Sequence, residues 1–119
     1  MLLAIQNNLK EKYITAAIIH RTESKNGGYK EVNKQYDVLT RIYRHMEKDG
    51  ELAVVMISEL LKHPNDDVSS WAAAHALGLK IFVDEAEKVL ERISRKKDLV
   101  SLNAEMTLKV WRERGYLKF

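Results

Sequence analysis

Apolar residues recur at every third or fourth position along most of this chain, which is the spacing of one face of an α-helix. Residues that break helices are few, since the 119 positions hold one proline and five glycines, and these fall between the periodic segments. The pattern therefore predicts an all-α protein. Its helices are expected over six segments, at about residues 3–21, 29–48, 51–62, 66–79, 84–97 and 99–114.

Polar residues mark the expected helix ends. The polar stretch 22–28 is expected to end the first helix, and Gly115 to end the last one, leaving residues 116–119 as a tail. Asn65 or Asp66 can cap the fourth helix after the turn at Pro64, and Asp98 can cap the sixth. Because the loops are short, helices that follow one another should pack antiparallel.

Two of the predicted helices, the fourth and the sixth, carry apolar residues on more than one face. In the sixth, one stripe holds Leu99, Leu102, Met106 and Val110, and a second holds Val100, Ala104, Leu108 and Trp111. Helices with two packing faces suit a stack of helix pairs better than a simple four-helix bundle. We therefore predict six antiparallel helices in a HEAT-like or armadillo-like repeat stack, forming one domain over residues 1–119.

Residues 60–78 resemble a HEAT-type repeat: a Pro-Asn turn precedes Val68, and an alanine-rich helix ends in Ala-Leu-Gly, although Ser69 stands where arginine is usual. Most of the chain is similar to a small bacterial family of HEAT-like helical domains of unknown function. The segments that carry this similarity are 33–37, 60–65, 86–93, 104–108 and 115–119. Small proteins of this kind resemble the immunity proteins of contact-dependent growth inhibition and other polymorphic toxin systems.

Composition narrows the class of protein. The chain is 45% hydrophobic and 31% charged, which is typical of globular domains, and it has no cysteine for a disulfide or a thiolate metal site. No apolar run approaches the roughly 18 residues of a transmembrane helix, and the first residues lack the pattern of a secretory signal. We expect a cytoplasmic protein that does not act at a membrane.

Charge is unevenly distributed along the sequence. Residues 63–91 contain six acids and two bases, for a net charge of −4, whereas residues 92–119 contain eight bases and three acids, for a net charge of +5. The acidic stretch suits a partner with a cationic surface, such as a nuclease active site, and the basic final third suits an acidic partner. The sequence does not choose between these alternatives.

Motifs for catalysis are missing. No His-Glu-x-x-His pattern, phosphate-binding glycine loop or nucleophile elbow is present, so we expect no catalytic residues, no metal, no cofactor and no small-molecule substrate. Paired acids at 66–67 and 84–85 are better explained as residues that begin helices. Trp71 and His75 lie one turn apart, and the favoured interpretation places them in the core, with a contact role for Trp71 as the alternative.

These observations, with the resemblance, predict an immunity protein that binds and neutralises a cognate toxin domain by occluding its active site. It would not be an enzyme. The alternative is a sequence-independent nucleic-acid-binding protein that uses the basic final third, which we disfavour because helix-end preference explains most of those charges. The residues predicted to contact the toxin are Asp66, Asp67, Trp71, Asp84, Glu85, Glu87 and Glu91.

Overall fold

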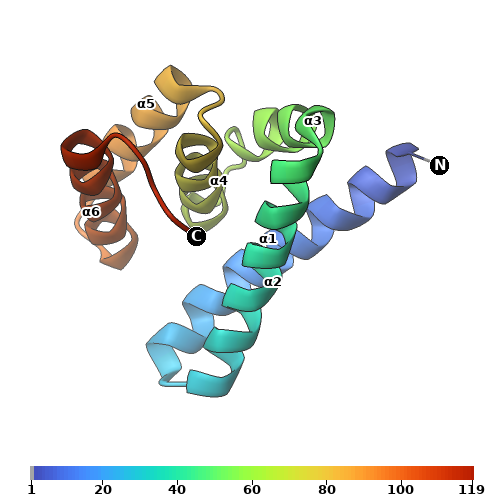
Figure 1. The fold of residues 1–119 in the computed structure, drawn as a ribbon. Coiled ribbons are helices and arrows are strands. Elements are labelled where there is room, and N and C mark those ends of the chain that lie inside the picture. Colours follow the sequence, from blue (N-terminus) through green and yellow to red (C-terminus); the bar gives the residue numbers. More distant parts are fainter. Residues whose placement is uncertain (1) are drawn as a thin grey trace. The chain divides into compact units, whose positions relative to one another are not determined.

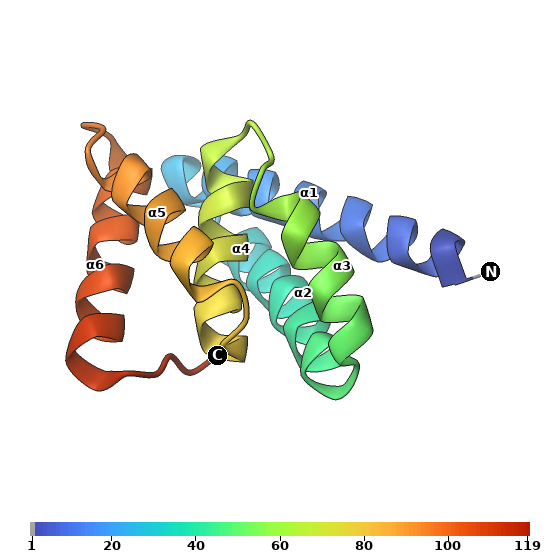
Figure 2. The same ribbon diagram turned by 90° about the horizontal axis from the view of Figure 1, so that it is seen from above.

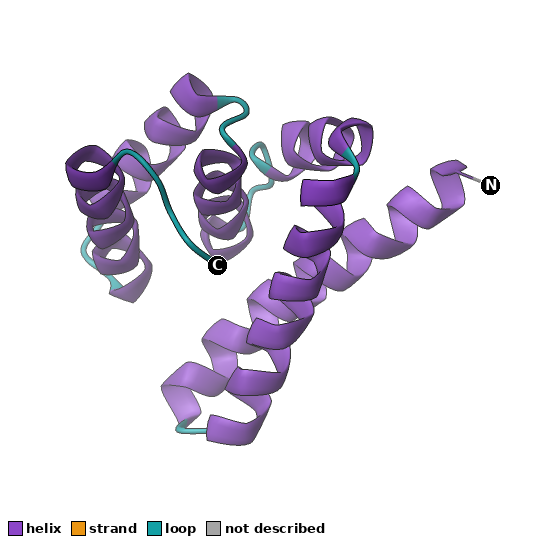
Figure 3. Cartoon of the chain, viewed as in Figure 1, coloured by secondary structure: helices purple, strands orange, loops and turns teal. Residues whose placement is uncertain are grey.

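The computed structural model describes residues 2–119, with side chains from residue 4 onward, and this part of the chain forms six α-helices and no strand (Figure 3). The all-α prediction is confirmed. The helices are α1 (Leu2–Asn26), α2 (Tyr29–Lys48), α3 (Gly50–Leu60), α4 (Asp66–Leu79), α5 (Val83–Ser94) and α6 (Leu99–Arg114). The chain forms two compact units: an amino-terminal unit that ends at Met56 and a carboxy-terminal unit that begins at Ile57.

In the amino-terminal unit, α1 and α2 pack against each other as an antiparallel hairpin (Figure 1). Both helices bury the apolar positions that recur at helical spacing. The buried side chains include Tyr13, Ala16 and Ala17 from α1 and Leu39, Ile42, Tyr43 and Met46 from α2. Because the connection at Gly27 and Gly28 is short, the two helices that it joins pack against each other.

The prediction that α1 ends near residue 21 was wrong, because the helix continues to Asn26. The hydroxyl groups of Thr22 and Ser24 donate to the carbonyl oxygens four residues earlier, at 3.0 and 2.6 Å. These side chains are therefore accommodated on the helix surface instead of ending it. Gly27 ends the helix with a φ of 72°, a left-handed conformation that glycine adopts without the steric cost of a Cβ.

In the carboxy-terminal unit, α4 packs against both α5 and α6. Figure 2 shows α5 beside α4. The sequence permits this because α4 is built largely of small residues, which let neighbouring backbones approach closely. Its buried residues cover most of its circumference: Val68, Ser69, Ala72, Ala73, Ala74, His75, Ala76 and Leu77. The arrangement of helices as HEAT-like repeats remains a prediction.

Local caps fix the ends of these helices. The Asn65 side chain accepts hydrogen bonds from the backbone N–H groups of Asp67 and Val68, at 2.9 and 3.3 Å, and Asp98 forms a capping box with Ser101. Gly115 ends α6 as predicted, with a φ of 76°. The tail after Gly115 then returns to α4 (Figure 1). There the Phe119 ring contacts the His75 ring.

None of the helices formed by residues 2–119 is long and apolar enough to cross a membrane.

Candidate protein-binding surface

Helix α6 buries three residues of one of its two apolar stripes and exposes three of the other, while Trp111 and Val110, the last residues of the two stripes, are half-buried. Val100, Ala104 and Leu108 are buried in the carboxy-terminal unit. Leu99, Leu102 and Met106, which we call the α6 stripe, are 52%, 57% and 61% exposed. Contiguous exposed apolar surface of this kind marks interaction sites in soluble proteins. The α6 stripe is therefore the principal candidate for a binding surface.

Charged residues follow the α6 stripe on the same side of the helix. Lys109 and Glu113 lie seven residues after Leu102 and Met106, which places them on nearly the same face two turns further along. Both side chains are exposed. The carboxyl end of the stripe is thus bordered by one charge of each sign, an arrangement that gives orientation to a partner without favouring a strongly acidic or basic one.

Asp66, a predicted contact residue, is already paired within the carboxy-terminal unit. Its carboxylate forms ion pairs with Arg92, in the last turn of α5 at 3.4 Å, and with Lys96, in the turn that follows α5. Partial burial raises the pKa of the Asp66 carboxyl, but the hydrogen bonds and charges of Lys96 and Arg92 outweigh that effect and lower the pKa below its ordinary value. The pairing joins the start of α4 to the end of α5, as antiparallel packing requires.

Two further predicted acids face α6. The Trp111 indole Nε1 donates to Glu87 Oε1 at 3.0 Å, and Arg112 pairs with Glu91 at 2.5 Å. Trp111 itself is half-buried, and its indole N–H has the partner that such a group needs. These acids therefore contribute to the packing of α5 on α6, and a partner would have to compete for them.

The other predicted contact residues lie in different surroundings. Asp84 and Glu85 are exposed in the first turn of α5, at the opposite end of that helix from the pair that Asp66 forms. Asp67 and Trp71 are half-buried on α4. The structure thus does not gather the six predicted acids and Trp71 into one patch.

His75 lies in the core of the carboxy-terminal unit. Its ring is fully buried, 5.6 Å from the Trp71 ring and 4.6 Å from the Phe119 ring between centroids. Burial lowers the pKa of His75 to about 3, because removing the ring from water penalises its charged form. His75 is therefore a neutral core residue near pH 7, as the favoured interpretation of the sequence held, whereas Trp71, which that interpretation also placed in the core, is half-buried.

The basic final third is also partly paired. Lys96 and Arg112 form the ion pairs described above, while Arg95, Lys97, Lys109 and Arg114 are exposed. In the part of the chain that the structure describes, no three acidic or histidine side chains gather as a metal site would require.

The sequence did not reveal which stripe of α6 would be exposed, since both have the same apolar character. The signal that could have helped is the continuation of the α6 stripe into the charged pair Lys109 and Glu113, because charged residues more often extend a solvated face.

Comparisons with protein-family models, curated proteins and solved structures find no match to this chain.

Proposed function

We propose that this protein binds and neutralises a cognate toxin domain in the cytoplasm by covering its active site, without catalysing a reaction. The observation that carries the binding role is the α6 stripe, three large apolar side chains more than half exposed on a helix whose opposite face is core. Removing such a surface from water is favourable, at about 25 cal/mol per Å² of apolar area. The toxin class of the partner comes from the resemblance to immunity proteins.

The contact surface in this proposal centres on the α6 stripe, with Asp84 and Glu85 as additional contacts. These two acids are exposed and have no ion pair with any described side chain, so they can meet cations of a nuclease active site. Asp66, Glu87 and Glu91 contribute less to the partner, because they already stabilise contacts between helices. The α6 stripe would form the apolar centre of the interface, and Lys109 and Glu113 at its carboxyl end would form a charged margin, as in other protein interfaces.

The test is co-expression with the product of the gene immediately upstream, with an affinity tag on one partner. A stoichiometric complex, together with toxicity when this chain is omitted, is the expected result. A neighbour that is harmless and does not bind would overturn the proposed function.

A double variant, Leu102→Asp with Met106→Asp, locates the interface. Both side chains are exposed, so the helical circular dichroism spectrum should be unchanged while the complex is lost. The matched control is Lys88→Asp, which adds a carboxylate at an exposed position of α5. Retention of the complex by the double variant would show that the toxin binds elsewhere.

A nucleic-acid-binding role is the second candidate, and the exposed cations Arg95, Lys97, Lys109 and Arg114 favour it. Its signature is binding to DNA or RNA that weakens steeply as salt is added, because phosphate contacts release counterions. We rank it second because ion pairs within the unit already occupy Lys96 and Arg112.

A further inference from the structure

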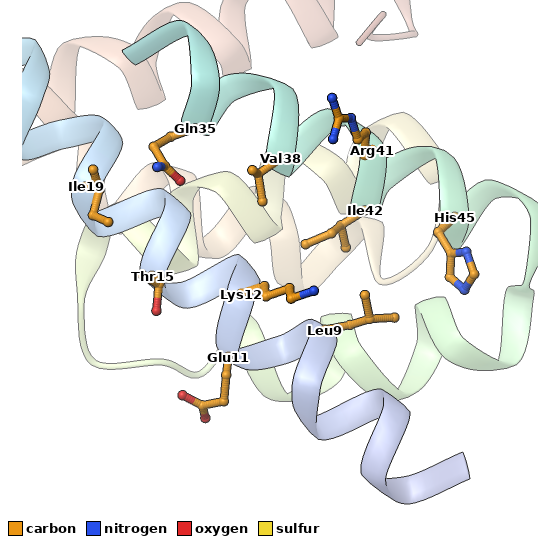
Figure 4. Close-up of a pocket in the computed structure, with 10 residues that line it drawn as sticks. All are labelled: Leu9, Glu11, Lys12, Thr15, Ile19, Gln35, Val38, Arg41, Ile42 and His45. Atoms are coloured by element: carbon orange, nitrogen blue, oxygen red, sulfur yellow. The ribbon is translucent and has the colours of Figure 1, made fainter. Parts of the chain in front are cut away.

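Helix α2 has an apolar face that packs on α1 and a cationic face that is exposed. Figure 4 shows the Ile42 side chain directed from α2 toward α1 and the Arg41 side chain on the other side of α2. Five exposed cations lie on that other side, within an arc of about 80° for a helix of 3.6 residues per turn. We call them the α2 cation row: Lys30, Lys34, Arg41, Arg44 and Lys48. The row extends along about 27 Å of helix.

Most of the α2 cation row is not neutralised within the molecule. Arg44 pairs with Glu47 at 2.9 Å, but the other four cations form no ion pair with a described carboxylate. The only other exposed acid among the described residues of α2 is Asp37, so the exposed residues of this helix carry a net charge of +3. Two pairs of like charge stand four residues apart in the row, at 30 and 34 and at 44 and 48, and such pairs destabilise a helix. A polyanion would relieve this repulsion.

The surroundings of the α2 cation row favour a nucleic acid over a membrane or a protein. A helix that lies on a membrane inserts its apolar face, but the apolar face of α2 is packed against α1. A protein interface has an apolar centre, whereas no aliphatic side chain of α2 is exposed. Interfaces with nucleic acids are more polar and more positively charged than interfaces between proteins. A chain of phosphates can also meet successive cations along the row.

Two exposed tyrosines flank the α2 cation row. Tyr29 is 79% exposed and Tyr36 is 40% exposed, and their spacing of seven residues places them on nearly the same face of α2. Aromatic side chains beside a cationic track provide surfaces on which unpaired bases stack. The tyrosines therefore favour a single strand over a duplex, whose bases are already stacked on one another.

We propose that the α2 cation row binds the phosphate backbone of single-stranded nucleic acid, without sequence preference, while bases stack on Tyr29 and Tyr36. Binding at this row is independent of toxin neutralisation, because the α6 stripe belongs to the other unit. The cations considered above for nucleic-acid binding, such as Arg95 and Lys97, also belong to the carboxy-terminal unit.

The test is fluorescence anisotropy of a labelled oligo(dT) of about 12 nucleotides, titrated with the full chain. Saturable binding is expected, and the logarithm of the binding constant should fall against the logarithm of salt with a slope of about −3, since each of four cations contributes about 0.7. A duplex of the same length, vesicles that contain phosphatidylserine and polyglutamate should each bind at least about fivefold more weakly, because none offers unpaired bases. No binding of oligo(dT) at low salt, or equal binding of any of these three, would overturn the proposal.

Substitutions in α2 locate the site. Lys34→Gln and Arg41→Gln should each weaken oligo(dT) binding about eightfold at about 50 mM salt and reduce the salt slope by about 0.7, because each removes one phosphate contact. Asp37→Asn should strengthen binding about twofold, because it removes an acid from the same face. The matched control is Lys12→Gln, at an exposed cation of α1 outside the row. Equal weakening by Lys12→Gln, or no gain from Asp37→Asn, would contradict binding at the row.

Tyr29→Ala should weaken oligo(dT) binding at least about fivefold through loss of stacking, and Tyr116→Ala, at an exposed tyrosine of the other unit, is its control. Replacing Arg95 and Lys97 together by glutamine should leave binding nearly unchanged. Loss of binding in that double variant, with retention in the α2 variants, would place the nucleic acid on the carboxy-terminal unit and overturn the proposal. The comparison of oligo(dT) with the three other ligands, made on the unmodified chain, decides the outcome if a variant fails to fold.

Discussion

The ring of Phe119 stands edge-on against the ring of His75, with 4.6 Å between their centroids and 85° between their planes. The last residue of the chain therefore packs against a helix that begins more than 50 positions earlier. Edge-to-face contact is a favoured geometry for aromatic pairs, and it shields His75 from water. The tail should consequently contribute to stability, and protonation of His75 should reduce it.

Replacing Phe119 with alanine should lower the free energy of unfolding by about 1–3 kcal/mol, because a half-buried aromatic side chain and its ring contact are lost. Urea denaturation followed by circular dichroism measures the effect. Lys118→Ala, at an exposed neighbouring position, is the control and should change stability little. An equal loss in both variants would mean that the tail acts through its backbone.

The free energy of unfolding should decrease as the pH is lowered through the range between the folded-state and unfolded-state pKa values of His75. The unfolded chain takes up a proton at its ordinary pKa of 6.5, whereas the folded state resists protonation until the pH is about 3. Between these values the unfolded state binds more protons, so this group reduces stability by up to about 1.4 kcal/mol for each pH unit of acidification.

The His75→Gln variant, with a side chain that does not titrate, should show a flatter dependence of unfolding free energy on pH between about 4.5 and 6.5. The control is His45→Gln, which makes the same substitution at an exposed histidine. The same slope in His75→Gln and the unmodified chain would contradict the assignment.

The Asp66→Asn substitution should reduce stability by up to about 1 kcal/mol near neutral pH, because the ion pairs with Lys96 and Arg92 are lost on a partly exposed surface. Since the pKa of Asp66 is lowered in the folded state, its contribution is present above the unfolded pKa near 4 and disappears as acid protonates the folded carboxylate. Thermal unfolding at neutral and acidic pH tests this. Glu105→Gln, at an exposed position of α6, should show no such difference.

Asn65→Ala should cost about 1 kcal/mol, because the backbone N–H groups of Asp67 and Val68 lose the side chain that caps α4. Chemical denaturation gives the value. The control is Asn103→Ala, the same substitution at an exposed position inside α6, where alanine is a better helix former than asparagine. Destabilisation of that control to the same extent would rule out capping as the cause.

Lys80→Gly should stabilise the protein by about 0.5–1 kcal/mol. Lys80 caps the carboxyl end of α4 with a φ of 58°, in the left-handed region that disfavours residues with a Cβ. Its side chain is exposed, so little packing is lost. The contrast is Lys88→Gly inside α5, which should destabilise by a similar amount. A lower melting temperature for Lys80→Gly would contradict the strain argument.

The sequence by itself determined the local structure of this protein. Apolar spacing, a cap at Asn65 or Asp66, the cap at Asp98 and the glycine at 115 predicted six helices, because these signals act within a few residues of one another. Two ends were wrong: α1 continues to Asn26, and α5 stops at Ser94, three residues before its expected end. The error at α1 has a local cause too, since Thr22 and Ser24 can bond either to water or to the preceding turn.

Tertiary structure alone decided which of these surfaces is free. The two stripes of α6 are equivalent in the sequence, but packing on α5 and α4 buries Val100 and Leu108 and leaves Leu102 and Met106 exposed. In the sequence, Asp66 is one acid among several, but the fold pairs it with Lys96, which lies 30 positions later in the chain. Burial and pairing depend on residues that are distant in the chain, so helix periodicity predicts which side chains share a face but not what covers that face.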